Sequence, residues 1–235
     1  MNEAIILAGG FGTRLKNVVS DVPKPMAPVN GQPFLVYLVN YLKHYGVNKI
    51  VFSTGYLGEV IEQYFGKEFN NISIEYSLEN SPLGTGGGIR LAMNKITGEQ
   101  CWVLNGDSFF DVDLKKMYQL HENSKVEMSI ALRKVPNASR YGCVEVDSVN
   151  NITVFNEKSA VTAAGLINGG VYLLNKKYFL TNTIPDTNFS IERDCFPESV
   201  KQKQISGFEF NGFFIDIGIP EDYNKAQNDF KKFKY

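Results

Sequence analysis

The feature that most constrains the fold is an apolar strand that runs directly into a glycine-rich loop near the N-terminus. Residues 5–7 form a continuous apolar run, which is typical of a strand buried inside a sheet. Glycines in such a loop let backbone N–H groups point inward and approach a ligand closely, and this arrangement suits an anion, above all a phosphate. The loop supplies glycines, a hydroxyl and a cation: Gly9, Gly10, Gly12, Thr13 and Arg14.

A second cation follows the loop. Lys24 stands between two prolines, whose rings fix the backbone on either side of it. No glycine in the chain is followed by Lys and then Ser or Thr, which excludes a Walker loop, and Leu15 interrupts the dinucleotide fingerprint that Gly10 and Gly12 begin. These features together favour a phosphate site over a plain turn with two surface cations: the strand, the glycine-rich loop, Arg14, and Lys24 between its two prolines.

The spacing of apolar residues predicts two halves that differ in secondary structure. Strand-like and helix-like segments alternate over the first 125 residues, which indicates βαβ units and a largely parallel sheet. Later segments are mostly strand-like, and no Ser/Pro-rich linker separates the halves. The predicted strands are 49–54, 72–76, 102–104, 128–132, 143–146, 152–155, 167–174 and 213–215, and the predicted helices are 33–45, 60–65, 89–93, 114–121 and 220–231.

A second glycine-rich stretch, residues 82–88, precedes the predicted helix at 89–93. Two interpretations are open. The free N–H groups of a helix N-terminus suit an anion or a polar ligand. Alternatively, the small residues let the helix pack closely on the sheet.

Carboxylates follow two predicted strands. Asp107 comes after the strand at 102–104, and Asp216 comes after the strand at 213–215. Ligands of open α/β sheets bind outside the carboxyl ends of strands, so a carboxylate at such an end can reach into a ligand crevice, while Asp107 could alternatively cap its turn. Asp113 is expected to cap a helix instead, and Glu192 and Asp194 are expected on a helix surface.

Composition narrows the function classes. The chain has 235 residues and a net charge of −1. It therefore lacks the excess of positive charge that is typical of proteins that bind nucleic acids. No apolar run approaches the roughly 20 residues that a membrane span needs. The sequence begins without a signal-like segment, and its three cysteines show neither metal spacing nor a disulfide framework, so a cytoplasmic location is expected. The two histidines, His44 and His121, are assigned to structure, which leaves no histidine as a general base.

The segments L-A-G-G-F-G-T-R-L and P-K-P-M resemble the signature of the sugar-1-phosphate nucleotidylyltransferases. P-L-G-T, G-D and D-I-G-I-P-E-D-Y follow in the family's order, so the resemblance covers nearly the whole chain. It implies an α/β fold: a Rossmann-like three-layer αβα architecture with a mostly parallel mixed sheet. Residues 1–235 would form a single nucleotidyltransferase domain, with a nucleotide-binding half at 1–125 and a β-rich sugar-binding half with a C-terminal helix at 126–235.

The resemblance also implies the reaction. A sugar 1-phosphate and a nucleoside triphosphate give a nucleotide-sugar and pyrophosphate, with Mg²⁺ as cofactor. Similarity to the small heptose 1-phosphate guanylyltransferases implies GTP and D-glycero-D-manno-heptose 1-phosphate, with GDP-heptose serving capsule or lipopolysaccharide synthesis. Longer relatives often place Gln in the base-contacting stretch before the glycine loop, where this chain has Glu79-Asn80-Ser81, and this difference argues against a pyrimidine. A uridylyl- or thymidylyltransferase, a non-catalytic nucleotide-sugar sensor, and a homodimer stay open.

The same resemblance assigns roles to individual residues. Arg14 is expected on the β- and γ-phosphates, Lys24 on the α-phosphate, and Asp107 and Asp216 on the metal. The nucleotide is expected to contact Leu7, Ala8, Gly9, Gly10, Gly12, Thr13, Gly84 and Thr85. The sugar phosphate is expected to contact Gly142, Glu157, Lys158, Asn168 and Gly170.

Overall fold

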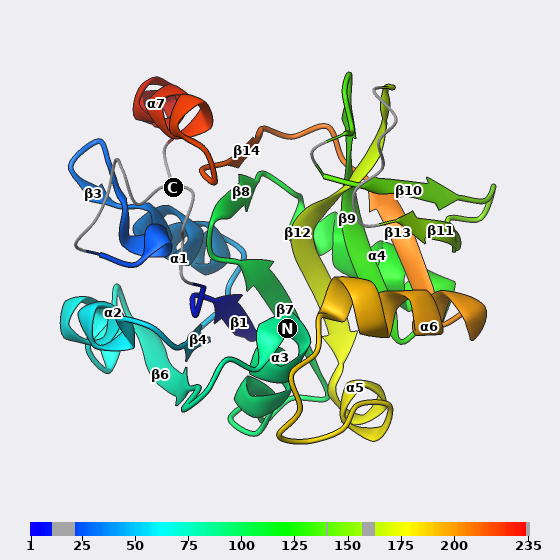
Figure 1. The fold of residues 1–235 in the computed structure, drawn as a ribbon, viewed down its shortest axis with the longest axis horizontal. Helices are drawn as coiled ribbons and strands as arrows, with labels where there is room; N and C mark the ends of the chain where they lie inside the picture. Colours follow the sequence, from blue (N-terminus) through cyan, green and yellow to red (C-terminus); the bar gives the residue numbers. More distant parts are fainter. Residues whose placement is uncertain (11–21, 140, 157–162, 234–235) are drawn as a thin grey trace.

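The centre of the fold is a parallel group of strands within a ten-stranded mixed sheet, shown in Figure 1. β1 (Glu3–Leu7) lies between β7 (Gln100–Asn105) and β4 (Lys49–Thr54), and β6 (Ile72–Leu78) lies beyond β4. All of these neighbours pair in parallel. The parallel sheet expected from the alternation of the first half is therefore confirmed.

The second half continues the same sheet with antiparallel pairs. β12 (Gly165–Asn175) pairs with β7 on one side and with β9 (Met128–Val135) on the other. One sheet therefore runs through both halves of the chain. The remaining strands are β2 (Pro28–Val29), β3 (Gln32–Pro33), β5 (Glu68–Phe69), β8 (Ser108–Phe110), β10 (Cys143–Val146), β11 (Ile152–Asn156), β13 (Ile205–Glu209) and β14 (Phe214–Asp216).

This computed structural model describes residues 1–10, 22–139, 141–156 and 163–233. Its α-helices are α1 (Phe34–His44), α2 (Gly58–Phe65), α3 (Gly84–Met93), α4 (Leu114–Ser124), α5 (Lys176–Thr181), α6 (Phe196–Lys201) and α7 (Pro220–Asp229). Short turns of other helical types occur at η1 (Lys24–Met26), η2 (Ile191–Cys195) and η3 (Phe230–Lys232). Within the described residues, no helix combines the length and the apolar character that a membrane crossing requires.

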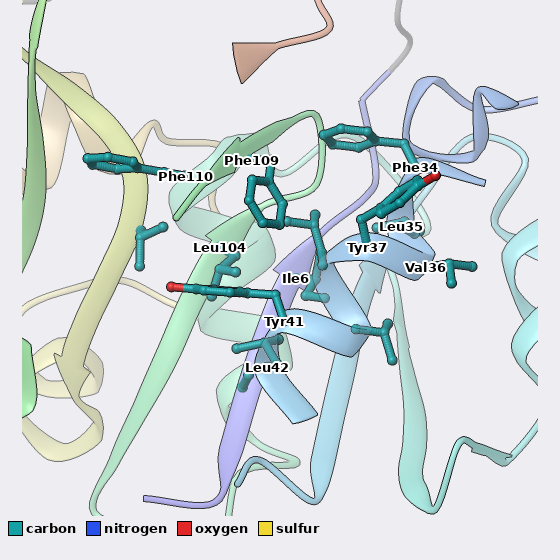
Figure 2. Packing of buried hydrophobic residues seen from close by; sticks show 14 of the residues in the cluster. Ile6, Phe34, Leu35, Val36, Tyr37, Tyr41, Leu42, Leu104, Phe109 and Phe110 are labelled. Carbon is teal, nitrogen blue, oxygen red and sulfur yellow. The ribbon is translucent and has the colours of Figure 1, made fainter. Parts of the chain in front are cut away.

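Helices cover both faces of the sheet, because successive side chains of a strand point to opposite faces. Ala4 and Ile6 belong to the apolar cluster that includes α1, α4 and α7, whereas Ile5 belongs to the cluster that includes α3, α5 and α6. Figure 2 shows Ile6 of the central strand beside Tyr41 and Leu42 of α1. The three-layer α/β fold expected from the sequence is therefore confirmed.

The glycine-rich stretch differs from its expectation, because α3 begins at Gly84 and residues 84–88 are already helical. The reason is close packing. A Cβ on Gly86 would lie 2.1 Å from a ring atom of Phe189, and a Cβ on Gly88 would lie 2.8 Å from Ser53 Oγ on β4. The glycines thus let α3 approach both the sheet and the segment that precedes η2.

Other local expectations are confirmed. Asp113 caps α4 by accepting a hydrogen bond from Lys116 N at 3.0 Å. His121 is buried, its Nδ1 lies 2.7 Å from Ser129 Oγ, and burial lowers its pKa, so it is a neutral core residue. Burial also raises the pKa of Cys195 to about 11, which keeps this thiol protonated.

Candidate active site

A cleft of about 610 Å³ opens at the carboxyl ends of the parallel strands. Residues that follow β1, β4, β6 and β7 line it, together with the first turn of α3. This is the edge where open α/β sheets bind ligands. The expected site residues that line the cleft are Leu7, Gly9, Gly10, Gly84, Thr85 and Asp107.

Glycines allow the strand ends to converge at this cleft. A Cβ on Gly55, after β4, would lie 3.1 Å from Gly9 O, and a Cβ on Gly106, after β7, would lie 2.4 Å from Leu7 O. Gly106 N donates to that same Leu7 carbonyl at 2.9 Å. Ala8 is buried between these contacts, with its N–H donating to Ser53 O, so it supports the cleft wall.

Lys24, Asp107 and Asp216 meet beside the cleft. The Lys24 ammonium lies 2.6 Å from Asp107 Oδ2 and 3.6 Å from Asp216 Oδ1. The two acidic residues come together because β8 pairs antiparallel with β14, and Ile217 N donates to Asp107 O at 3.0 Å. Lys24 lies in η1, and only 13% of its side chain is exposed. Two carboxylates thus converge on one cation.

The turn after β14 contacts two of these charged groups, the Asp216 carboxylate and the Lys24 ammonium. Gly218 N donates to Asp216 Oδ1 at 2.7 Å. A Cβ on Gly218 would lie 2.7 Å from Asp216 Oδ1 and 2.9 Å from Lys24 Nζ, so a larger residue here would displace these two charged groups. The described residues contain no group of three or more Cys, His, Asp or Glu side chains that suits a metal. A divalent ion held by Asp107 and Asp216 would therefore need oxygen ligands from a substrate or from water.

Glu79 brings a carboxylate to another part of the cleft. It follows β6 directly, as Asp107 follows the strand end of β7, and it lines the cleft with Tyr56. Leu83 N donates to its Oε2 at 2.9 Å, and Ser53 Oγ donates to its Oε1 at 3.3 Å. These bonds hold an acceptor-only group against the cavity. Its place directly after a parallel strand is the sequence signal for such a role.

Several polar groups at the N-terminus of α3 already form hydrogen bonds within the protein and are not available to a ligand. Gly86 N and Gly87 N both point to Phe189 O, at 3.0 and 3.4 Å. Thr85 Oγ1 donates to Glu192 Oε2 at 2.7 Å, so this side chain is also engaged by the protein. The close-packing interpretation of the glycines therefore holds for the middle of the stretch, while Gly84 and Thr85 still border the cleft.

Three of the expected sugar residues, Gly142, Asn168 and Gly170, are described, and they lie on the side of β7 that is away from β1. Asn168 and Gly170 occupy an irregularity of β12, where the pairing with β9 shifts, and Gly170 N donates to Asn168 Oδ1 at 2.9 Å. A Cβ on Gly170 would lie 3.0 Å from Asn105 Nδ2, and Asn105 lines the cleft. Gly142 precedes β10, next to Tyr141, whose ring packs edge-on against Phe214 of β14.

Other expected residues cannot be placed. Gly12, Thr13, Arg14, Glu157 and Lys158 lie outside the described residues. Their roles stay predictions from the sequence.

The expectation that Glu192 lies on a helix surface is wrong. Its carboxylate accepts hydrogen bonds from Thr85 Oγ1 and from Ser190 Oγ, the latter at 2.8 Å. Asp194 is exposed as expected, but it also accepts a hydrogen bond from Ser190 N at 2.7 Å. The helical spacing of residues 189–200 contains no signal for the Glu192 contacts, because they join segments far apart in the chain.

Comparisons with known proteins agree with this geometry. A family model described as nucleotidyl transferase matches residues 3–232. The D-glycero-alpha-D-manno-heptose 1-phosphate guanylyltransferase of Aneurinibacillus thermoaerophilus is 45% identical over 98% of this chain and 99% of that protein. The protein of the same name from Campylobacter jejuni is 44% identical over 94% of this chain and 96% of its own.

A solved structure also matches over nearly the full length. HddC from Yersinia pseudotuberculosis superposes with a TM-score of 0.87 at 37% identity, covering 98% of this chain and 100% of that chain. A second structure of HddC, in complex with GMP-PN, superposes with a TM-score of 0.85.

Proposed function

Because this chain belongs to the nucleotidyl transferase family, we propose that it joins GTP to D-glycero-D-manno-heptose 1-phosphate, giving GDP-heptose and pyrophosphate. The names of the relatives and the GMP-PN complex of HddC support guanine and heptose. The observation that carries the reaction is the convergence of Lys24, Asp107 and Asp216 beside a glycine-lined cleft.

The proposed chemistry is an in-line displacement at phosphorus. A phosphate oxygen of the sugar 1-phosphate attacks the α-phosphorus of GTP, and the bond to the departing pyrophosphate breaks. The second pKa of a phosphate monoester is about 6, so the nucleophile is already an anion near neutral pH. No general base is needed, in agreement with a described cleft lining that contains no histidine. The protein's task is to align two polyanions and to neutralise charge.

Lys24 is proposed to stabilise charge that builds on the α-phosphate. Asp107 and Asp216 are proposed to hold Mg²⁺, since hard carboxylate oxygens suit this ion and the pair already surrounds a cation. When bound, the metal would polarise phosphate oxygens and offset their negative charge. Arg14 and Lys158 are proposed to bind the pyrophosphate and the sugar phosphate, as the family resemblance implies.

Glu79 supports guanine as the base. The Watson–Crick edge of guanine presents two neighbouring donors, N1–H and the N2 amino group, and a carboxylate can accept from both. Uracil and thymine instead present one donor between two carbonyl oxygens, which a carboxylate repels. Adenine and cytosine each present one donor beside an acceptor. The anchored Glu79 carboxylate in the cleft thus suits guanine better than the other bases.

Substituting Glu79→Gln is expected to raise the KM for GTP by roughly 10- to 100-fold, because hydrogen bonds to a charged group contribute about 1.5–3 kcal/mol. The kcat should change less, since the base lies away from the reacting phosphorus. Steady-state kinetics with GTP and UTP would measure both effects. Glu75→Gln is the matched control, because Glu75 lies in β6, the strand that Glu79 follows, but pairs with Lys49 and Lys95. An unchanged preference for GTP in Glu79→Gln would contradict this assignment.

The proposed function is tested by pyrophosphate release from purified protein with Mg²⁺. Each of GTP, UTP, dTTP, CTP and ATP is combined with mannose, glucose and heptose 1-phosphates. Release with GTP and the heptose phosphate is expected. Release with UTP or dTTP alone would overturn the base assignment and leave the reaction class intact. Nucleotide binding without any release would favour a sensor and would overturn the catalytic proposal.

A further inference from the structure

A chain of hydrogen bonds connects the nucleotide cleft to the irregular part of β12. Thr85 and Asn105 both line the cleft. Thr85 contacts Glu192, Asn105 contacts Tyr172, and Tyr172 and Glu192 contact each other. Thr85 Oγ1 donates to Glu192 Oε2 at 2.7 Å, the Tyr172 hydroxyl lies 3.5 Å from Glu192 Oε1, and Asn105 Nδ2 lies 3.4 Å from the Tyr172 hydroxyl. Asn168 Nδ2 completes the chain by donating to the same hydroxyl at 2.8 Å.

The Tyr172 hydroxyl determines which groups in this chain donate hydrogen bonds and which accept them. Two amide groups donate to its oxygen, so its own hydrogen points to the Glu192 carboxylate. The Tyr172 side chain is fully buried, and burial together with the charge of Glu192 raises its pKa well above the ordinary range. The hydroxyl therefore stays protonated near neutral pH and can donate to Glu192.

The two ends of this chain belong to different parts of the proposed site. Thr85 lies in the first turn of α3, on the nucleotide side. Asn168 orders the irregular segment of β12 by accepting a hydrogen bond from Gly170 N, and both residues are expected sugar contacts. Glu192 itself lies in η2, a π-helical turn, and such turns occur often at functional sites.

We propose that Glu192 and Tyr172 are positioning residues that hold the sugar-side segment 168–170 at a set position relative to the nucleotide cleft. The inference rests on the proposed function, because it assigns the sugar 1-phosphate to that segment. In-line attack requires the two phosphates to be aligned closely, and a small displacement lowers the rate even when both substrates still bind. Loss of the bridge therefore lowers kcat more than it weakens GTP binding.

Glu192→Gln tests the bridge with little change in shape. The Glu192 carboxylate accepts from three hydroxyl groups, whereas the amide nitrogen of glutamine accepts from none, so at least one donor loses its partner. The expected result is a fall in kcat of about tenfold with the KM for GTP nearly unchanged. Tyr172→Phe keeps the buried ring and removes the hydroxyl, and it should have the same kinetic signature.

Two further variants separate positioning from general stability. The double variant Glu192→Gln/Tyr172→Phe should be no slower than the slower single variant, because both changes break one bridge. Asp194→Asn is the matched control, since Asp194 lies in the same turn and caps Ser190 N. It should keep the parent's kcat. Equal loss of kcat in Asp194→Asn and Glu192→Gln, or parent-like kcat in Glu192→Gln, would overturn the inference.

A readout without turnover distinguishes this inference from the proposed function. Hydrogen exchange of the parent protein should slow at residues 165–172 when GTP binds, and Glu192→Gln should lose this effect while residues 84–88 stay protected. Protection at residues 165–172 that persists in Glu192→Gln would overturn the bridge alone. A parent protein that releases no pyrophosphate with any substrate pair would overturn the proposed function, and the exchange result would still decide the bridge.

Discussion

Replacing Lys24 with alanine is expected to lower kcat by about 10²- to 10³-fold, the usual cost of removing one electrostatic contact to a transition state. Lys24 carries the described cation nearest to Asp107 and Asp216, and its side chain is largely shielded from water. A charge in such a place acts on a reacting phosphate more strongly than one in bulk water. The KM for GTP should change less than kcat, because the contact strengthens as charge builds on the α-phosphate.

Lys201→Ala is the matched control for that result. Lys201 is an exposed lysine of α6 that pairs with Glu198 at 3.0 Å, and its loss should leave kcat unchanged. Thermal unfolding of both variants would show that the fold is kept. A Lys24→Ala protein that turns over as fast as the parent would show that the α-phosphate is stabilised by other groups.

Substituting Asp216→Asn or Asp107→Asn is expected to lower the rate at fixed Mg²⁺ by about 10²- to 10³-fold, because a metal ion supplies several kcal/mol of charge stabilisation. An amide oxygen is neutral and holds a hard cation less firmly than a carboxylate. Part of the lost rate should return at higher Mg²⁺ concentration. The measurement is the dependence of pyrophosphate release on Mg²⁺ for the parent and both variants.

Metal binding without turnover provides the second readout for these variants. Mn²⁺ titration in the presence of GTP, followed by electron paramagnetic resonance, should show weaker binding to Asp216→Asn than to the parent. Asp113→Asn is the control, since it removes a carboxylate charge at the start of α4 while asparagine still caps this helix. Equal Mn²⁺ affinity in the parent and in Asp216→Asn would contradict the assignment of Asp216 as a ligand.

Local patterns predicted most of the longer strands and helices, because the formation of such an element depends on near neighbours in the chain. The continuous apolar run at residues 5–7 indicated a buried strand, and β1 is buried on both faces between α1 and α3. The prediction missed β13, a five-residue strand whose partner β9 is distant in sequence. It also placed the start of α3 too late, because glycine lowers helix propensity and the packing of Phe189 on Gly86 outweighs that preference.

The site was predicted unevenly for a related reason. Lys24, Asp107 and Asp216 stood in recognisable segments, and the structure brings them together. Glu192 stood in a segment whose spacing indicated only a helix surface, and its partners Thr85 and Tyr172 are distant in the chain. A spacing pattern records what one element presents, and it contains no information on which other element will meet it.

The sequence by itself determined the alternation of strands and helices in the first half of the chain, the buried central strand, and the residue types available for phosphate and metal chemistry. These properties follow from side-chain size, polarity and periodicity within single segments. Only the tertiary structure decided that the β8–β14 pairing brings Asp216 to Asp107 and Lys24, and that Glu192 joins the nucleotide side to β12. The physical reason is that hydrogen bonds and ion pairs act over a few ångströms, so they exist only after sheet pairing and core packing have brought distant segments into contact.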